Sequence, residues 1–500
     1  MDSGRRSVLE TVRNQVQLIA YVDRLSGGNF RELQALLDGP FAGLFGGLHL
    51  LPFFWPTDGA DAGFDPIDHT KVDPRLGTWE DVRDLSQRAE IMADLIVNHI
   101  SSRSPQFEDF RTKGEASPYS EMFLTFGRIF QNGAAESELL KVYRPRPGLP
   151  FTKMRLDDGT EHLLWTTFTS EQIDIDVRTP QGKNYLDQIL SQFHRAGIHA
   201  IRLDAAGYAI KKAGTSCFML PETFAFIAEL TAQAHALGIE VLVEIHSRYR
   251  EQIEIARHVD WVYDFALPPL VLHTLYTRNA RSLKNWLEMS PRNAVTVLDT
   301  HDGIGVRDAT GLIPPEDIAR LVETIHARSN GASRQATGAA ANNLDLYQVN
   351  CSYYDALGRC DNEYLLARAL QFFAPGVPHV YYGGLLAVEN DLELLRHTGV
   401  GRDINRHYFT RSEIEHGLTR PVVRALLDLM RFRNTHPAFQ GEFHLSPCDE
   451  DAIRLEWRAG NDRASLEADL RAMSATVSYS STAGKQEFSL GSRKAIEVSP

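Results

Sequence analysis

Three acidic residues follow short apolar runs in the middle of the chain. Asp204 ends the run IRLD, Glu244 ends VLVE, and Asp302 ends THD. Glycosyl transfer with retention of configuration needs one carboxylate that attacks the anomeric carbon and one carboxylic acid, about 5 to 5.5 Å away, that protonates the leaving oxygen. Carboxylates that share a cleft raise one another's pKa, which favours a site with one ionised and one protonated group. The three residues therefore predict this chemistry.

The neighbours of two of these residues predict their roles. Arg202 lies two positions before Asp204, so strand alternation puts both on one face, and its positive charge should keep Asp204 ionised as the nucleophile. Glu244 has no such cation beside it in sequence and follows an apolar run, where desolvation would raise its pKa towards that of an acid/base. His246, two positions further on, would temper that rise.

Eight short apolar runs, most of them followed by a segment with helical periodicity, predict parallel strands joined by crossover helices. The predicted strands are residues 16–21, 47–52, 91–97, 200–204, 240–244, 261–265, 294–298 and 378–382. The clearest predicted helices are residues 80–89, 181–196, 222–237, 362–373 and 420–433. Eight alternations indicate an α/β fold, a closed (β/α)8 TIM barrel, in which active sites form at the carboxyl ends of the strands.

Two connections are too long to be simple crossovers and predict inserted, loop-rich domains that roof the site. The first is rich in Gly, Pro and aromatic residues and shows little helical pattern, and the second includes the Ala- and Gly-rich residues 332–341. After residue 436 the sequence alternates apolar and polar residues, which predicts a small C-terminal antiparallel β domain. The predicted boundaries are 1–97, 179–303 and 361–435 for the barrel, 98–178 and 304–360 for the insertions, and 436–500 for the β domain.

The overall composition is that of a globular enzyme, with 43% hydrophobic and 23% charged residues among 500. A net charge of −13 argues against sequence-independent nucleic-acid binding and gives no membrane-surface signal, so no nucleic-acid or membrane partner is expected. The first residues lack a secretory apolar run, and the four cysteines show no paired metal spacing. We therefore expect a cytoplasmic protein with reduced cysteines.

Four segments resemble the signature blocks of the α-amylase superfamily of retaining glycoside hydrolases. They are residues 93–99, 201–204, 243–246 and 298–302. Further segments are similar to the sucrose phosphorylase branch of that superfamily: residues 59–65, 143–150, 213–218, 262–268, 343–348 and 401–406. The resemblance spans roughly residues 15 to 436.

The resemblance implies Asp204 as nucleophile, Glu244 as acid/base and Asp302 as transition-state stabiliser. It also implies residues that hold the glucosyl unit: Asp61, Phe64, His99, Arg202, His301 and Arg402. On the acceptor side it adds Tyr143, Asp345, Tyr347 and Gln348, and the predicted substrate-binding set also includes Phe168, Tyr208 and His246. The substrates implied are sucrose, inorganic phosphate, glucose 1-phosphate and fructose.

Arg146 is a candidate phosphate ligand on independent grounds. It lies between Pro145 and Pro147, which restrict the conformations of its loop, and a guanidinium can bind phosphate through two hydrogen bonds. The alternative is that Arg144 and Arg146 are solvated loop charges.

Several alternatives remain open at the level of sequence. A related phosphorylase would act on sucrose 6′-phosphate, glucosylglycerol or glucosylglycerate, although the blocks 143–150 and 343–348 favour sucrose. Hydrolysis or transglucosylation of sucrose uses the same residues, whereas a carbohydrate-binding scaffold would have lost some of the three acids. No cofactor and no metal are expected, although Asn98 matches a position that binds calcium in many α-amylases. The oligomeric state is left open, with a homodimer as one option.

Overall fold

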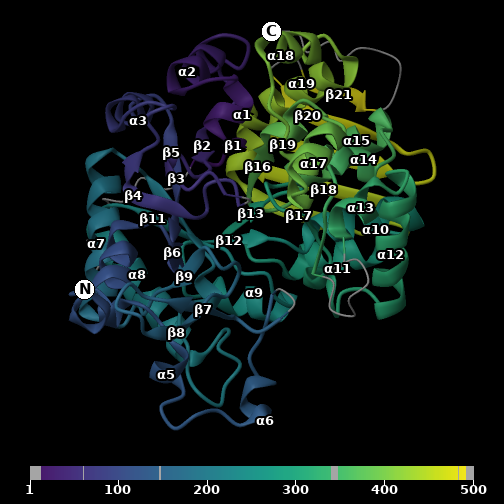
Figure 1. Ribbon diagram of the computed structural model, residues 1–500. Coiled ribbons are helices and arrows are strands. Elements are labelled where there is room, and N and C mark those ends of the chain that lie inside the picture. Colours follow the sequence, from purple (N-terminus) through teal and green to yellow (C-terminus); the bar gives the residue numbers. More distant parts are fainter. Residues whose placement is uncertain (1–12, 60, 146–147, 339–346, 482–483, 491–500) are drawn as a thin grey trace, which may run out of the picture. The chain divides into compact units, whose positions relative to one another are not determined.

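The computed structural model describes residues 13–59, 61–145, 148–338, 347–481 and 484–490 (Figure 1). By their contacts, these residues fall into two units. Unit 1 runs from Leu50 to Ile245, and unit 2 combines Arg13–His49 with the chain from His246 onward.

A closed barrel of eight strands is the central element of the fold. Its strands follow one another around the barrel in the order β1, β16, β13, β12, β11, β10, β5 and β2. Their bounds are β1 Gln17–Ala20, β2 Gly47–Leu50, β5 Glu90–Ile96, β10 Ala200–Asp204, β11 Glu240–Val243, β12 Trp261–Asp264, β13 Ala294–Thr296 and β16 Val377–Tyr381. The recorded pairings are parallel; Ala200, for example, is the partner of both Met92 and Glu240. The predicted barrel is confirmed, and each predicted strand overlaps one of these eight.

The barrel strands are buried on both faces, which explains why they read as continuous apolar runs and not as alternating ones. All five residues of β10 are buried, including Arg202 and Asp204. Some of the helices between the strands begin at a side-chain cap: Thr179 caps α7, whose first residue is Pro180. The predicted helices appear as α3 Trp79–Ser86, α7 Pro180–Arg195, α8 Pro221–Ala236, α15 Asp361–Phe373 and α19 Pro421–Thr435.

The remaining barrel-side elements are short. They are α1 Val22–Ser26, α2 Phe30–Asp38, β3 Phe54–Pro56, β4 Pro66–Val72, η3 Ala206–Tyr208, α9 Tyr249–Ile255, α10 Leu267–Thr277, α11 Arg281–Met289, α16 Tyr382–Leu385, α17 Leu392–Thr398, η6 Gly401–Asn405 and α18 Arg411–Gly417. None of the helices in the described part of the chain has the length and apolar character needed to span a lipid bilayer.

The connection after β5 contains only short elements. They are β6 His99–Ser101, α4 Pro105–Lys113, η1 Gly114–Ala116, η2 Ser120–Met122, α5 Phe126–Ile129, α6 Glu136–Leu139, β7 Phe151–Arg155, β8 Glu161–Trp165 and β9 Gln172–Asp174 (Figure 1). A small apolar cluster holds this segment together, made of Leu124, Phe130, Val142, Trp165 and Cys217.

The connection after β13 is more helical than its sequence indicated. It contains β14 Ile304–Gly305, η4 Arg307–Ala309, α12 Pro315–Arg328, α13 Ala332–Thr337, β15 Gln348–Val349 and α14 Tyr353–Ala356. The sequence analysis did not anticipate α12, although acidic residues in its first turn and basic residues in its last complement the helix dipole. Helix α13 packs against η6, where Ala336 and Ile404 share an apolar cluster with Leu395.

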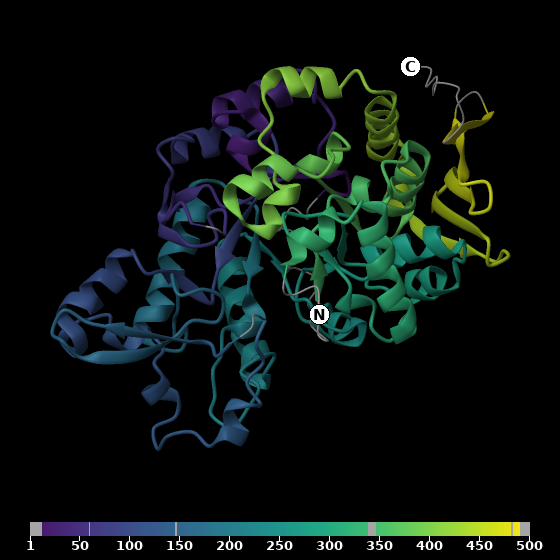
Figure 2. The same ribbon diagram turned by 45° about the vertical axis from the view of Figure 1, so that its right-hand side comes forward.

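The C-terminal β domain is confirmed as a five-stranded antiparallel sheet, drawn in yellow in Figure 2. Its elements are η7 Pro437–Gln440, β17 Glu442–Ser446, β18 Ala452–Ala459, β19 Asp462–Asp469, β20 Ser474–Ser481 and β21 Gly484–Leu490. The sheet packs on α15, and the indole N–H of Trp457 donates to the carbonyl of Phe373 at 2.9 Å.

Candidate active site

The end of β10 gathers three carboxylates around one guanidinium. Nη1 of Arg202 lies 3.1 Å from Asp204 and 2.5 Å from Asp94, and its Nη2 lies 2.6 Å from Glu244. Arg202 and Asp94 are fully buried, whereas Asp204 and Glu244 keep about a tenth of their side-chain surface exposed. The two predicted catalytic acids of unit 1 therefore face the same space.

This geometry corrects the expected charge distribution. The sequence predicted that Arg202 keeps Asp204 ionised and leaves Glu244 without a cation, but Arg202 contacts both. Burial, followed by the negative charge of Glu244, raises the pKa of Asp204 well above its usual range, and Arg202 only partly offsets the rise. Because three carboxylates share one positive charge, the cluster favours the uptake of a proton.

Residues predicted to hold the sugar lie beside this cluster in unit 1. The ring of Phe64 is 5.4 Å from the guanidinium carbon of Arg202, and the carbonyl of Phe64 lies 2.9 Å from Nε2 of His99. Burial lowers the pKa of His99, which favours the neutral ring. The amide of Gln172 donates to Asp61 at 2.8 Å and lies 3.1 Å from His99. Gln172 was missed by the sequence analysis, because nothing in the surrounding residues marks it.

Aromatic rings form one side of the same region. Phe168 meets His99 edge-on at 5.4 Å and Tyr208 at 5.2 Å. Tyr143 stacks on Phe218 at 4.5 Å, and Phe218 contacts Tyr208 at 4.7 Å. The three predicted aromatic residues are therefore brought together, with Phe218 as an additional member.

Asn98, the position compared with a calcium ligand, contacts an internal ammonium group. The Nζ of Lys211 donates to Oδ1 of Asn98 at 2.7 Å, to the carbonyl of Tyr208, and to Asp174, whose Oδ2 lies 2.8 Å away. The side chains of Lys211 and Asp174 are fully buried. This ammonium connects Asp174, at the end of β9, to Asn98, two positions after the end of β5.

The predicted residues of unit 2 gather around Asp302. Nη1 of Arg402 lies 2.8 Å from Oδ1 of Asp302, and its Nη2 donates to the hydroxyl of Tyr347 at 3.1 Å. Nε2 of His301 lies 3.8 Å from Asp302. Burial alone would raise the pKa of Asp302, but the positive charge of Arg402 holds that pKa well below its usual range. Asp302 is therefore ionised at neutral pH.

His246 is fixed within unit 2 by three side chains. Its ring stacks on Phe265 at 4.0 Å, its Nδ1 lies 3.2 Å from Asp308, and its Nε2 lies 3.2 Å from the amide nitrogen of Gln348. Asp308 was also missed by the sequence analysis, because it lies outside the matched segments. Arg146 and Asp345 lie outside the described residues, so their positions stay predictions.

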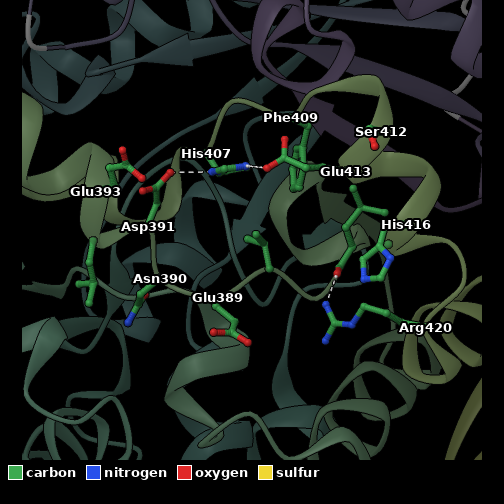
Figure 3. A pocket seen from close by; sticks show the side chains of 14 residues that line it. Glu389, Asn390, Asp391, Glu393, His407, Phe409, Ser412, Glu413, His416 and Arg420 are labelled. Carbon is green, nitrogen blue, oxygen red and sulfur yellow. Dashed lines mark hydrogen bonds and ion pairs between the residues drawn. The ribbon is translucent and has the colours of Figure 1, made fainter.

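A separate cavity of about 620 Å³ opens between α17 and α18 (Figure 3). His407 lies in its wall, 2.6 Å from Asp391 and 3.4 Å from Glu413. None of the predicted site residues lines this cavity. The backbone N–H of Asp391 donates to the carbonyl of Ile404 at 2.7 Å, so this wall braces η6, which carries Arg402.

Comparison with known proteins shows which enzymes this chain resembles. Residues 45–257 match the family model of the α-amylase catalytic domain. A sucrose phosphorylase from Agrobacterium vitis is 60% identical over 94% of this chain and 98% of its own, and one from Bifidobacterium adolescentis is 53% identical over 91% and 92%. The crystal structure of a sucrose 6F-phosphate phosphorylase from Thermoanaerobacter thermosaccharolyticum superposes with a TM-score of 0.89 at 39% identity, covering 95% and 98% of the two chains.

The closed barrel and the matched family model define an enzyme of the α-amylase type. At this identity and coverage, the chain belongs to the sucrose phosphorylase family.

Proposed function

We propose that the chain catalyses the reversible phosphorolysis of sucrose to α-glucose 1-phosphate and fructose. The observation that carries the proposal is near-full-length similarity to two sucrose phosphorylases, one of them 60% identical. Asp204 is the last residue of β10, Glu244 directly follows β11, and Asp302 follows β13 by six positions, and the carboxyl ends of barrel strands are where catalytic residues of such enzymes lie.

In the first half-reaction, a carboxylate oxygen of Asp204 attacks the anomeric carbon of the glucosyl unit. The bond from that carbon to the fructosyl oxygen breaks, and Glu244 gives its proton to this oxygen. The shared contact with Arg202 holds both groups at one guanidinium, and a cluster of three carboxylates around one cation favours the uptake of one proton. The division of roles itself is the one that the resemblance to retaining enzymes implies. Asp302, ionised beside Arg402, stabilises the positive charge that develops on the sugar.

In the second half-reaction, a phosphate oxygen attacks the same carbon and releases Asp204. Glu244 accepts the proton that the phosphate loses, so two inversions give retention overall. Water is present at about 55 M, so phosphate competes only if the protein binds and orients it. We assign Arg146 and the acceptor-side residues Tyr347, Gln348 and His246 to this task.

The test is incubation of the purified chain with sucrose in phosphate buffer, without metal or nucleotide. We expect glucose 1-phosphate in excess over free glucose, and proton NMR early in the reaction should show the α-anomer only. Early formation of β-glucose 1-phosphate would refute the double displacement. Free glucose as the sole product would mean that the chain is a sucrose hydrolase.

Sucrose 6F-phosphate is the second candidate donor, favoured by the close superposition on an enzyme named for it. That substrate carries a dianion on its fructosyl unit and requires further cationic ligands in the acceptor space. One experiment distinguishes the two donors: kcat/KM is measured with sucrose and with sucrose 6F-phosphate. We expect sucrose to be preferred, and the reverse order would reassign the donor while leaving the mechanism unchanged.

A further inference from the structure

Four groups of unit 2 form one hydrogen-bonded chain from the backbone beside Asp302 to a buried carboxylate. The N–H of Gly303 donates to Oε1 of Gln348 at 3.3 Å, and Nε2 of Gln348 lies 3.2 Å from Nε2 of His246. Nδ1 of His246 lies 3.2 Å from Oδ2 of Asp308.

The groups at the two ends of this hydrogen-bonded chain determine which member of each pair donates and which accepts. A backbone N–H can only donate, so it turns the amide oxygen of Gln348 towards Gly303 and the amide NH2 towards His246. An ionised carboxylate can only accept, so Nδ1 of His246 carries the hydrogen that faces Asp308. His246 is then the Nδ1–H tautomer, and its Nε2 accepts a hydrogen bond from Gln348.

The carboxylate of Asp308, at the far end of the hydrogen-bonded chain, is fixed by burial and by its neighbours. Its side chain is 0% exposed, and its other oxygen, Oδ1, accepts from Nε2 of Gln252 at 2.9 Å. A Cβ at Gly305 would lie 2.6 Å from Oδ2 of Asp308, so β14 approaches the carboxylate too closely for any side chain there. Gly305 is also the strand partner of Gln348 in the β14–β15 pair. The same pair of strands therefore supports both ends of the hydrogen-bonded chain.

We propose that Asp308 is a positioning residue for the acceptor side of the site: it selects the tautomer of His246 and, through it, the orientation of Gln348. The inference rests on the proposed function, in which these two side chains receive the incoming phosphate. Asp308 itself touches no substrate. By fixing His246 and Gln348, it presents their donors and acceptors to phosphate in one arrangement. This arrangement favours phosphorolysis over hydrolysis of the glucosyl ester on Asp204.

The test is Asp308→Asn. An asparagine can turn its NH2 towards His246, which moves the ring hydrogen to Nε2 and sets it against the NH2 of Gln348. We expect the ratio of glucose 1-phosphate to glucose, at a phosphate concentration near the wild-type KM, to fall about tenfold, with the KM for phosphate raised. The kcat/KM for sucrose, which reports formation of the glucosyl ester, should stay within about threefold of wild type. Loss of structure would lower both quantities together.

The matched control is Asp317→Asn, because Asp317 also faces a histidine, with 3.6 Å between its Oδ2 and Nε2 of His273 in the α10–α12 contact. This variant should leave the product ratio unchanged.

If Asp308→Asn does not fold, Gln252→Leu removes the other donor that orients the carboxylate and should shift the ratio in the same direction by about threefold. An unchanged ratio in the folded variant overturns the inference, whereas a wild-type chain that forms no glucose 1-phosphate overturns the proposed function first.

Discussion

At the scale of single residues, Arg202 is shared by the two acids of unit 1. Its guanidinium contacts Asp204, Glu244 and Asp94, so it supplies one positive charge to three carboxylates. Full ionisation of this group would leave two buried negative charges, which is costly in a low dielectric. In the proposed mechanism, the proton that this cluster retains is the one given to the leaving group, and Arg202 lies beside the attacking carboxylate.

The two acids should respond differently to isosteric substitution. Asp204→Asn should lower kcat on sucrose by a factor on the order of 10⁴ or more, because an amide cannot form the glucosyl ester. Glu244→Gln should lose activity on sucrose but keep measurable turnover of α-glucosyl fluoride, whose leaving group needs no proton. Circular dichroism serves as the folding control. Equal loss with both donors would argue against these roles.

Arg146 should affect the second half-reaction more than the first. Because it can bind phosphate through two hydrogen bonds, Arg146→Ala should raise the KM for phosphate about tenfold, equivalent to about 1.4 kcal/mol. Hydrolysis should rise relative to phosphorolysis, whereas kcat/KM for sucrose changes less. Arg144→Ala is the matched control from the same loop. A wild-type KM and product ratio in Arg146→Ala would identify a solvated loop charge.

At the scale of elements, the Lys211 ammonium holds the connection after β5 to the barrel. Lys211→Met should lower the free energy of unfolding by about 3–5 kcal/mol, because it leaves the buried carboxylate of Asp174 without its cation. The control is Lys183→Met, since Lys183 pairs with Glu229 at the surface and such pairs contribute about 0–1 kcal/mol. Urea unfolding measures both, and equal effects would mean that burial adds nothing to the Lys211 pair.

The elements also show what the sequence could and could not predict. The barrel strands were predictable because each is a short apolar run, and the matched blocks placed Asp204, Glu244 and Asp302 at their ends. The shared contact of Arg202 with Glu244 was not predictable, because it joins neighbouring strands whose register no local pattern specifies. Gln172 and Asp308 were not predictable either, because the contacts that give them a role, with Asp61 and His246, join residues 111 and 62 positions apart.

At the scale of the whole molecule, buried carboxyls make stability depend on pH. Burial raises the pKa of Asp264 to about 7, and Trp286 and Leu267 only partly offset this with hydrogen bonds. A raised pKa means that the folded state binds the proton more tightly, so this contribution to stability is full below about pH 4 and is lost as the pH rises towards 7. Asp302, whose pKa is lowered, contributes in the opposite sense, above about pH 4.

Asp264→Asn isolates the first of these effects. Relative to wild type, the variant should gain stability between pH 5 and pH 8 by more than about 1 kcal/mol, because it has no proton to lose over that range. Urea unfolding at the two pH values gives the difference. Asp317→Asn should show no comparable change, because the hydrogen bond with Arg320 lowers the pKa of Asp317 and its titration lies below this range. A constant difference between wild type and Asp264→Asn would show that Asp264 does not titrate in this range.

The close packing of η6 on α13 has an evolutionary consequence. A Cβ at Gly401 would lie 2.0 Å from the carbonyl oxygen of Ala336, so position 401 accepts no side chain while that backbone stays in place. Arg402, the next residue, holds Asp302. During evolution, substitutions in the loops around Arg402 are therefore tolerated only if Gly401 is retained or α13 shifts at the same time. A related sequence with a larger residue at position 401 would therefore need either a displaced α13 or a different backbone path before Arg402.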